Sequence, residues 1–284
     1  MGYLLALVCA VLQSSKDLVS KRLSRTVSGT TSAFASFLFA VPFYLVLLLI
    51  MSALGQEDFL LSRQFLLFVL LRSLTDVFAE WFKMSSFSMG DLSVMVCLQS
   101  LSPVFLLFTS PWITGDPITA NGVVGVLLVA VATVFFVYDP NRRTPTVSRK
   151  AIVFALLSAF FFSLNTCFDR LAVQIATPLW SAFAMNLLAA LFLLPLYLRS
   201  KGGSRELRAE IKLFSLRGLI ETFFMITKLW ALQFLQAPYV AALQRVSILI
   251  TVINGRVFLD EPFFARRIFA ALLMLAGVIV ILLS

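Results

Sequence analysis

The stretch LRSLTDVFAEWFK at residues 71–83 sets charged side chains at spacings of four, four and three residues in an otherwise apolar segment. A period of 3.6 residues stacks these positions on one face of a helix, with the signs of charge alternating along it. The stretch LRGLIETFFMITK at 216–228 repeats the pattern in the second half of the chain. The charged members are Arg72, Asp76, Glu80 and Lys83 in the first stretch, and Arg217, Glu221 and Lys228 in the second. Two such helices at corresponding places indicate a duplicated fold.

Two ungapped alignments extend the duplication over most of the chain. Residues 6–34 align with 155–183, and residues 71–137 align with 216–282. The matched pairs include Ser32-Ala33-Phe34 with Ser181-Ala182-Phe183, Gln99 with Gln244, Ser102 with Ser247, and Asp116-Pro117 with Glu261-Pro262. If each half holds five helices, an odd number, the second copy must be inverted relative to the first, as in many secondary transporters. The alternative is that the duplication is only an old way of building a helical bundle.

Composition places the chain in a membrane. Of its 284 residues, 60% are hydrophobic and 13% are charged, with a mean hydropathy of +0.97, whereas soluble domains are about half apolar and a quarter charged. A spanning helix needs about 20 apolar residues. Runs of this kind are expected at residues 2–23, 31–54, 65–87, 91–113, 119–138, 150–172, 178–199, 212–234, 237–258 and 264–284.

The predicted fold is therefore an all-α polytopic membrane protein with ten transmembrane helices in two inverted five-helix repeats. Residues 1–140 form the first repeat, 141–149 a cytoplasmic linker and 150–284 the second repeat. Pro103 is expected to kink the fourth span, because a proline removes a backbone donor inside a helix.

Lysine and arginine concentrate on alternate loops, as the positive-inside rule describes. One side carries Lys21, Arg22, Arg25, Arg142, Arg143, Arg149, Lys150, Arg199, Lys201, Arg205, Arg208, Arg266 and Arg267. The other side has Arg63 and Arg170. This asymmetry predicts cytoplasmic loops after the first, fifth, seventh and ninth spans and places both termini outside. We expect a multi-pass protein of the plasma membrane, or of the inner membrane if the source is bacterial.

The chain has no histidine and three cysteines, which removes most metal and general-base chemistry and any disulfide framework. No cofactor is expected, and the chain is not expected to be an enzyme. The formal net charge of +9 is read as the topological signal above, not as a nucleic-acid surface, because the basic residues punctuate apolar runs.

Ionisable residues inside a membrane are costly and usually line a cavity or pair with one another. The candidates for substrate binding are Lys16, Lys83, Gln99, Asn165, Lys228, Gln244 and Arg245. The candidates for ion pairing or for coupling transport to protons are Asp17, Arg72, Asp76, Glu80, Arg217 and Glu221. Lys228 has no acid three or four residues away on its own helix. Six bases against four acids in this set predict a preference for an anionic or zwitterionic ligand.

Two short segments near the end of the chain carry a resemblance. Leu259-Asp260-Glu261-Pro262 precedes the last span, and Ala276-Gly277-Val278 lies within it, while residues 229–238 read LWALQFLQAP. Together with the five-plus-five pattern, these resemble the drug/metabolite transporter superfamily and its ten-helix EamA-like family. Where that family often has Gln and Gly, this chain has Arg267 and Ala270.

The resemblance implies movement of a small polar metabolite by alternating access through a central cavity. The predicted function is thus a secondary-active permease or exporter, with an amino acid or a phosphorylated or nucleotide sugar as the type of substrate. The expected partners are the lipid bilayer and the transported molecule, with protons or a counter-substrate for coupling; no nucleic acid is expected and no oligomer is required. The alternatives are a structural or receptor-like membrane protein, and a cation or drug exporter of the same family.

Overall fold

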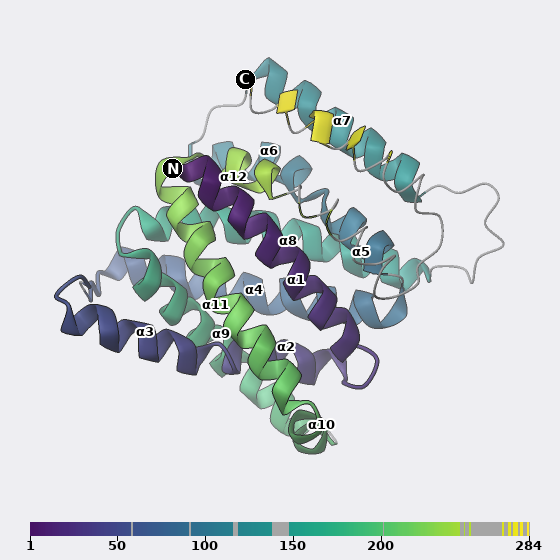
Figure 1. Cartoon of the computed structure of the whole chain (residues 1–284). Helices are drawn as coiled ribbons and strands as arrows, with labels where there is room; N and C mark the ends of the chain where they lie inside the picture. Colours follow the sequence, from purple (N-terminus) through teal and green to yellow (C-terminus); the bar gives the residue numbers. More distant parts are fainter. Residues whose placement is uncertain are drawn as a thin grey trace.

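The computed structural model of the chain describes residues 1–57, 59–90, 92–115, 119–137, 148–200 and 202–244, together with 247, 250 and scattered positions between 269 and 283. Every regular element in these ranges is helical (Figure 1). The helices are α1 (Gly2–Leu23), α2 (Gly29–Leu38), α3 (Val41–Ala53), α4 (Arg63–Met89), α5 (Leu92–Gln99), α6 (Ser102–Ile113), α7 (Ala120–Val137), α8 (Arg149–Val173), α9 (Pro178–Arg199), α10 (Gly203–Ala209), α11 (Ile211–Phe234) and α12 (Ala237–Leu243).

The helices follow the expected spans closely. α1 and α9 have the expected bounds, α8 is one residue longer at each end, and α4 is two residues longer at each end. The expected spans at 237–258 and 264–284 lie largely outside the described residues. The all-helical class is therefore confirmed for the part of the chain that the structure covers.

The second expected span is divided into α2 and α3. Pro42 stands at the start of α3, where its missing N–H is tolerated, whereas farther inside a continuous helix it would break a backbone hydrogen bond. α11 approaches this break closely: a Cβ atom added to Gly218 would lie 2.3 Å from the carbonyl oxygen of Phe39. Thr222, one turn later, contacts the carbonyl oxygen of Ala40 at 3.5 Å. Glycine at 218 lets the two backbones meet.

The fourth expected span is divided in the same way. α5 ends at Gln99 and α6 begins at Ser102, with Pro103 in its first turn. The expected kink is therefore a full break just before the proline. It leaves Gln99 and Ser102 on the two sides of an irregular backbone segment, which inside a membrane is tolerated where protein or a polar cavity covers it.

A short helix, α10, occupies the polar segment after α9, where only a loop was expected. Gly202 precedes it in the left-handed region, with a φ of 92°, and allows the sharp turn. Leu207 packs against apolar clusters around Phe34 and Phe214. Glu206 accepts hydrogen bonds from the backbone N–H and hydroxyl of Ser28. α10 thus fastens the segment between α9 and α11 to the start of α2.

The surface and the interior have the distribution of a membrane protein. Large apolar side chains such as Leu49, Trp112 and Leu198 are exposed, with Trp112 at 91%, which a water-soluble monomer rarely tolerates over wide patches. Four stretches of the described chain are long and apolar enough to cross a membrane: Gly2–Leu23, Gly29–Ala53, Arg149–Val173 and Pro178–Arg199. α4 and α11 carry several charged side chains that are buried in the bundle, among them Arg72, Glu80 and Arg217.

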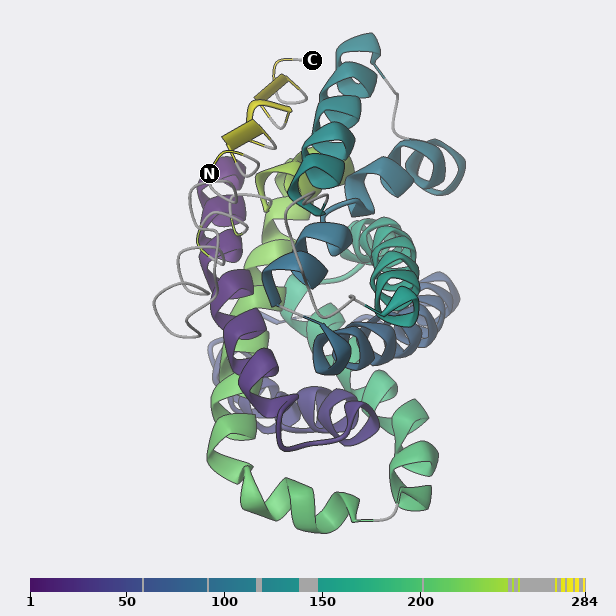
Figure 2. The same ribbon diagram turned by 90° about the vertical axis from the view of Figure 1, so that its right-hand side faces the viewer.

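Two pairs of long helices form the centre of the fold. α1 packs along α11, and α4 packs along α8. The two views of the ribbon place α1 beside α11 along much of their length (Figures 1 and 2). α11 also contacts α8, and α1 contacts α4, so the four helices enclose a common interior.

Candidate functional site

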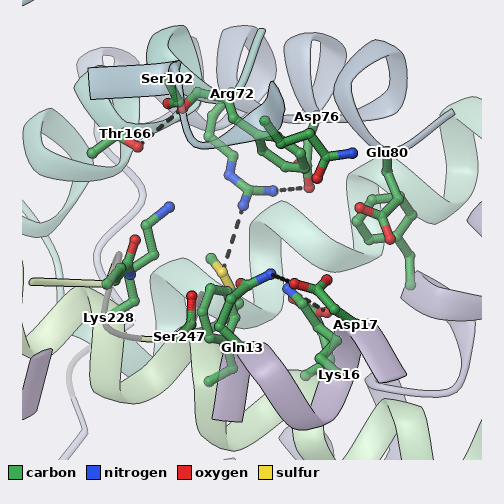
Figure 3. A pocket seen from close by; sticks show the side chains of 17 residues that line it. Gln13, Lys16, Asp17, Arg72, Asp76, Glu80, Ser102, Thr166, Lys228 and Ser247 are labelled. Carbon is green, nitrogen blue, oxygen red and sulfur yellow. Dashed lines mark hydrogen bonds and ion pairs between the residues drawn. The ribbon is translucent and has the colours of Figure 1, made fainter. Parts of the chain in front are cut away.

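A cavity of about 80 Å³ lies among these central helices (Figure 3). One water molecule needs about 10–15 Å³ by this measure, so there is room for several waters or for a small organic group. Most of the lining side chains are polar or charged, which suits a polar ligand. They are Gln13, Lys16, Asp17, Phe37, Arg72, Asp76, Glu80, Gln99, Ser102, Phe162, Thr166, Glu221, Phe224, Met225, Lys228, Gln244 and Ser247.

At the end of the cavity lined by Arg72 and Lys228 lies Asp169 of α8, whose side chain is fully buried. The Arg72 Nε donates a hydrogen bond to Asp169 Oδ1 at 2.9 Å, and the Lys228 Nζ donates to Oδ2 at 2.6 Å. A single carboxylate therefore holds a cation of α4 and a cation of α11. We call these three residues the Asp169 bridge. Arg72 also pairs with Asp76, one turn along its own helix.

The other end has a similar arrangement around Glu80 of α4. The Arg217 guanidinium donates to Glu80 Oε1, and the Lys83 Nζ lies 3.9 Å from Oε2. We call these three residues the Glu80 bridge. Lys83 has a closer partner in Asp17 of α1, at 2.7 Å, and Arg217 Nε donates to the Ser20 hydroxyl at 2.8 Å. The Glu80 bridge thus joins α4 to α11 and, through Asp17, to α1.

The two bridges are separated along the helix axes. Arg72 and Lys83 are eleven residues apart on α4, as are Arg217 and Lys228 on α11, and a rise of 1.5 Å per residue makes this about 16 Å. The hydrocarbon core of a bilayer is about 30 Å thick. The bridges therefore lie about 16 Å apart along these helices, with cavity-lining residues such as Asp76 and Glu221 between them.

Between the bridges, a further ion pair crosses from α1 to α11. The Lys16 Nζ lies 3.2 Å from Glu221 Oε2 and 3.7 Å from the centre of the Phe224 ring. Both contacts favour the charged amine, the second through the negative face of the ring. On the opposite wall, the Asn165 side-chain amide donates to Asp76 Oδ1 at 2.7 Å. These two pairs add polar contacts between α1 and α11 and between α8 and α4.

Two glutamine amides face the same space from α5 and from the residue after α12. Gln244 Nε2 lies 3.0 Å from the sulfur of Cys9. Gln99 is 7% exposed, and its Nε2 has no hydrogen-bond partner in the described part of the chain. A buried amide donor without a partner carries a desolvation cost, which a bound ligand with an acceptor oxygen would relieve.

The cavity brings most of the sequence-derived candidates together. Among the substrate-binding candidates, Lys16, Gln99, Lys228 and Gln244 line it, while Lys83 and Asn165 are buried behind its wall. Arg245 lies outside the described residues. Among the pairing candidates, Asp17, Arg72, Asp76, Glu80 and Glu221 line the cavity, and Arg217 lies behind Glu80.

Asp169 is the residue that the sequence-based candidate set lacked. Counting it gives five bases, Lys16, Arg72, Lys83, Arg217 and Lys228, against five acids, Asp17, Asp76, Glu80, Asp169 and Glu221, among the described buried residues. The expected positive surplus is therefore absent from this part of the chain. Lys228 finds its acid on α8, 59 residues away, so spacing along its own helix could not reveal the pair. The signal in the sequence was a carboxylate inside the sixth apolar span, with no lysine or arginine three or four residues away.

Two further basic residues close the ends of long helices. The Lys21 Nζ donates to the carbonyl oxygens of Phe87 and Gly90, at the end of α4. The Arg170 Nη1 donates to the carbonyl oxygens of Leu232 and Leu235, at the end of α11. Cations are favourable at helix C-termini, where carbonyl groups lack intrahelical donors. Arg170, one of the two exceptions to the charge asymmetry of the loops, thus has a structural role.

Comparison with known proteins gives this arrangement a family. The model of the EamA-like transporter family matches residues 1–138 and, separately, residues 149–283. The chain belongs to the EamA-like transporter family. This EamA-like protein is also 26% identical, over 302 aligned positions, to an uncharacterized transporter of Archaeoglobus fulgidus, with 99% of this chain and 95% of the relative covered.

A solved protein crystal structure superposes on the EamA-like chain with a TM-score of 0.68, covering 99% of this chain and 97% of the other at 15% identity. This likeness concerns the fold. Family membership identifies the chain as a multi-pass membrane transporter and points to transport without catalysis. In the described residues, no group of three or more Cys, Asp and Glu side chains is arranged to hold a metal ion.

Proposed function

We propose that this EamA-like protein is a secondary-active transporter that moves a small anionic or zwitterionic metabolite by alternating access, with ten spans in two inverted five-helix repeats. Two matches of one family model, to residues 1–138 and 149–283, support the duplication. The proposed substrate site is the charged cavity, with Lys16, Lys228, Gln99, Gln244 and Arg245 as ligand-binding groups. Lys83 and Asn165 support the wall from behind.

The observation that carries this proposal is a set of contacts that recur at aligned positions. The alignments pair Ser20 with Asp169, Arg72 with Arg217, Asp76 with Glu221, and Glu80 with Met225. Arg72 donates to Asp169 and to the sulfur of Met225; Arg217, its counterpart, donates to Ser20 and Glu80. Each arginine therefore contacts the same two aligned positions of the opposite half.

Other contacts recur in the same way. Asn165 donates to Asp76, and the aligned Lys16 donates to the aligned Glu221. The Ser158 hydroxyl donates to the carbonyl oxygen of Ala79, and the aligned Cys9 thiol lies 3.8 Å from that of Phe224. The helix caps made by Lys21 and Arg170 are aligned as well. Contacts related in this manner support two halves joined by a pseudo-two-fold axis, the arrangement in which transporters place their substrate.

We further propose that the basic loops face the cytoplasm and that both termini lie outside. The helix caps agree with this orientation, because Lys21 then lies at the cytoplasmic face and Arg170 at the opposite face. Asp17, Arg72, Asp76, Glu80, Arg217 and Glu221 serve as ion-pairing groups, and those that face the cavity are the candidates for coupling transport to protons or to a counter-substrate. The lipid bilayer and the substrate are the proposed partners.

Ligand binding should raise the melting temperature of the purified protein, because a ligand that binds only the folded state stabilises it. We expect a shift with anionic or zwitterionic compounds in a panel of amino acids, phosphorylated sugars, nucleotide sugars and organic cations. A compound at about 100 times its Kd contributes about 2.7 kcal/mol. The same compound should then be taken up by proteoliposomes. A shift with organic cations alone would favour a cation or drug exporter and contradict the proposed substrate class.

Lys228→Gln should remove the thermal shift given by the active compound while leaving the ligand-free protein folded, since glutamine can still donate to Asp169 but carries no charge. Lys212→Gln on the same helix is the matched control, because Lys212 is exposed and outside the cavity. The measurement is the melting temperature with and without compound. An undiminished shift in Lys228→Gln would remove Lys228 from the substrate site.

A further inference from the structure

The Asp169 bridge and the Glu80 bridge have matching compositions. In the alignments, Arg72 corresponds to Arg217, and Lys228 corresponds to Lys83. Each bridge therefore joins an arginine of one half to a lysine of the other half through the two oxygens of one carboxylate. Both carboxylates are buried.

The carboxylates themselves come from positions that are not aligned. Asp169 corresponds to Ser20, and Glu80 corresponds to Met225. Ser20 and Met225 still contact the arginines, at 2.8 Å and 3.6 Å. Arg72 thus contacts Asp169 and Met225, and Arg217 contacts Ser20 and Glu80. In each case, one of the two contacted residues is an acid.

We propose that the two bridges are the gates of the cavity: the Glu80 bridge closes it toward the cytoplasm, and the Asp169 bridge closes it toward the opposite face. Both link α4 to α11, which belong to different halves, at depths about 16 Å apart. Movement of one half against the other can therefore break one bridge while the second stays closed. This inference rests on the proposed transport function and topology, and it assigns the moving contacts to named residues.

Each gate links helices that must separate for ligand to enter. At the Glu80 end, opening breaks the contact between Glu80 of the first half and Arg217 of the second half. At the Asp169 end, opening breaks the contact between Asp169 of the second half and Arg72 of the first half. In the described structure both contacts are made. Loss of either carboxylate should shift the population toward the state open on that side.

Sided labelling of a cavity cysteine tests the gates without any transported compound. The background variant carries Cys9→Ser, Cys97→Ser and Cys167→Ser, with Ser102→Cys as the reporter, because Ser102 lines the cavity and belongs to neither bridge. A membrane-impermeant maleimide is applied to right-side-out and to inside-out vesicles. Glu80→Met should raise the labelling rate about tenfold from the cytoplasmic side only, and Asp169→Asn by a similar factor from the opposite side only, as expected when a minor open state becomes populated.

Ser247→Ala is the matched control, since Ser247 lines the cavity and belongs to neither bridge. It should leave the sidedness of labelling unchanged. Equal labelling from both sides in either bridge variant, or an unchanged rate in both, would overturn the proposal. Labelling needs no substrate. If none of the tested compounds is transported but labelling is still sided, the proposed substrate class is contradicted and the proposed gates are retained.

A compensating variant separates gating from a merely structural role. Glu80→Met with Ser20→Asp gives the cytoplasmic bridge the residues that the other bridge has, Met at the position aligned with Met225 and Asp at the position aligned with Asp169. We expect this double variant to fold and to recover the low cytoplasmic labelling rate. A double variant that is folded but still labelled rapidly, or one that does not fold when purified in detergent, would show that the carboxylate cannot close the gate from that position and would overturn the inference.

Discussion

Asp169→Ala is expected to lower the free energy of unfolding by about 3–5 kcal/mol, the cost of removing one partner from a buried ion pair. The substitution leaves Lys228 without its carboxylate, and Arg72 retains only Asp76. The measurement is the melting temperature of the detergent-purified protein. Glu206→Ala, which removes an acid near the surface on α10, should change stability by about 1 kcal/mol or less.

The double variant Asp169→Leu with Lys228→Met should recover most of this loss, because replacing both members of a buried pair by apolar side chains is often neutral or stabilising. It should nevertheless show no ligand-induced shift and no uptake, since the cavity has lost Lys228, one of its proposed ligand-binding cations. If Asp169→Ala is as stable as the wild type, the ion pairs of Asp169 do not contribute to the free energy of unfolding. A double variant that still transports would show that transport does not need this end of the cavity.

Gly218→Ala is expected to be among the most destabilising single-methyl additions in the chain. The added Cβ would lie 2.3 Å from the carbonyl oxygen of Phe39 and 2.9 Å from the backbone nitrogen of Ala40. Backbone atoms cannot move aside as a flexible side chain does, so α11 must shift away from the α2–α3 break, and overpacking of this kind costs about 1–3 kcal/mol or more.

The yield of folded protein and its melting temperature measure the effect of Gly218→Ala. Ser215→Ala is the control on the same helix, because Ser215 is only half-buried and its hydroxyl bonds within the helix in the described structure. If Gly218→Ala has the same melting temperature as Ser215→Ala, the close approach of the two backbones is not required for folding.

Sequence alone could predict the helices and the charged stripes because both depend on short-range periodicity. α1, α4, α8 and α9 follow directly from apolar runs, and the spacing of Arg72, Asp76, Glu80 and Lys83 shows a shared face. The break between α2 and α3 depends on Pro42 and on the approach of Gly218, which is distant in the chain. Local patterns carry no trace of that approach.

The partners within the charged network could not be predicted for a similar reason. Asp17 has no obvious connection with Lys83, and Glu80 none with Arg217, until the helices are packed. Lys228 illustrates the error that follows: without an acid on its own helix it is read as an unpaired cation, although Asp169 neutralises it. Aligning the two halves identified the residues of the cavity, and only packing could show how their charges balance.

The long sequence separation within the two bridges also has a consequence for how the chain enters the membrane. Asp169, the bridging acid of Arg72, lies 97 residues later in the chain. At a synthesis rate of about 5–20 residues per second, Asp169 is made about 5–20 s after Arg72. Asp76, only four residues later on α4, can neutralise Arg72 in the meantime, and Lys83 can do the same for Glu80, whose arginine is 137 residues away. The pairs within each helix are therefore suited to act as temporary counter-ions, which lower the cost of inserting α4 before the helices that complete the bridges have been made.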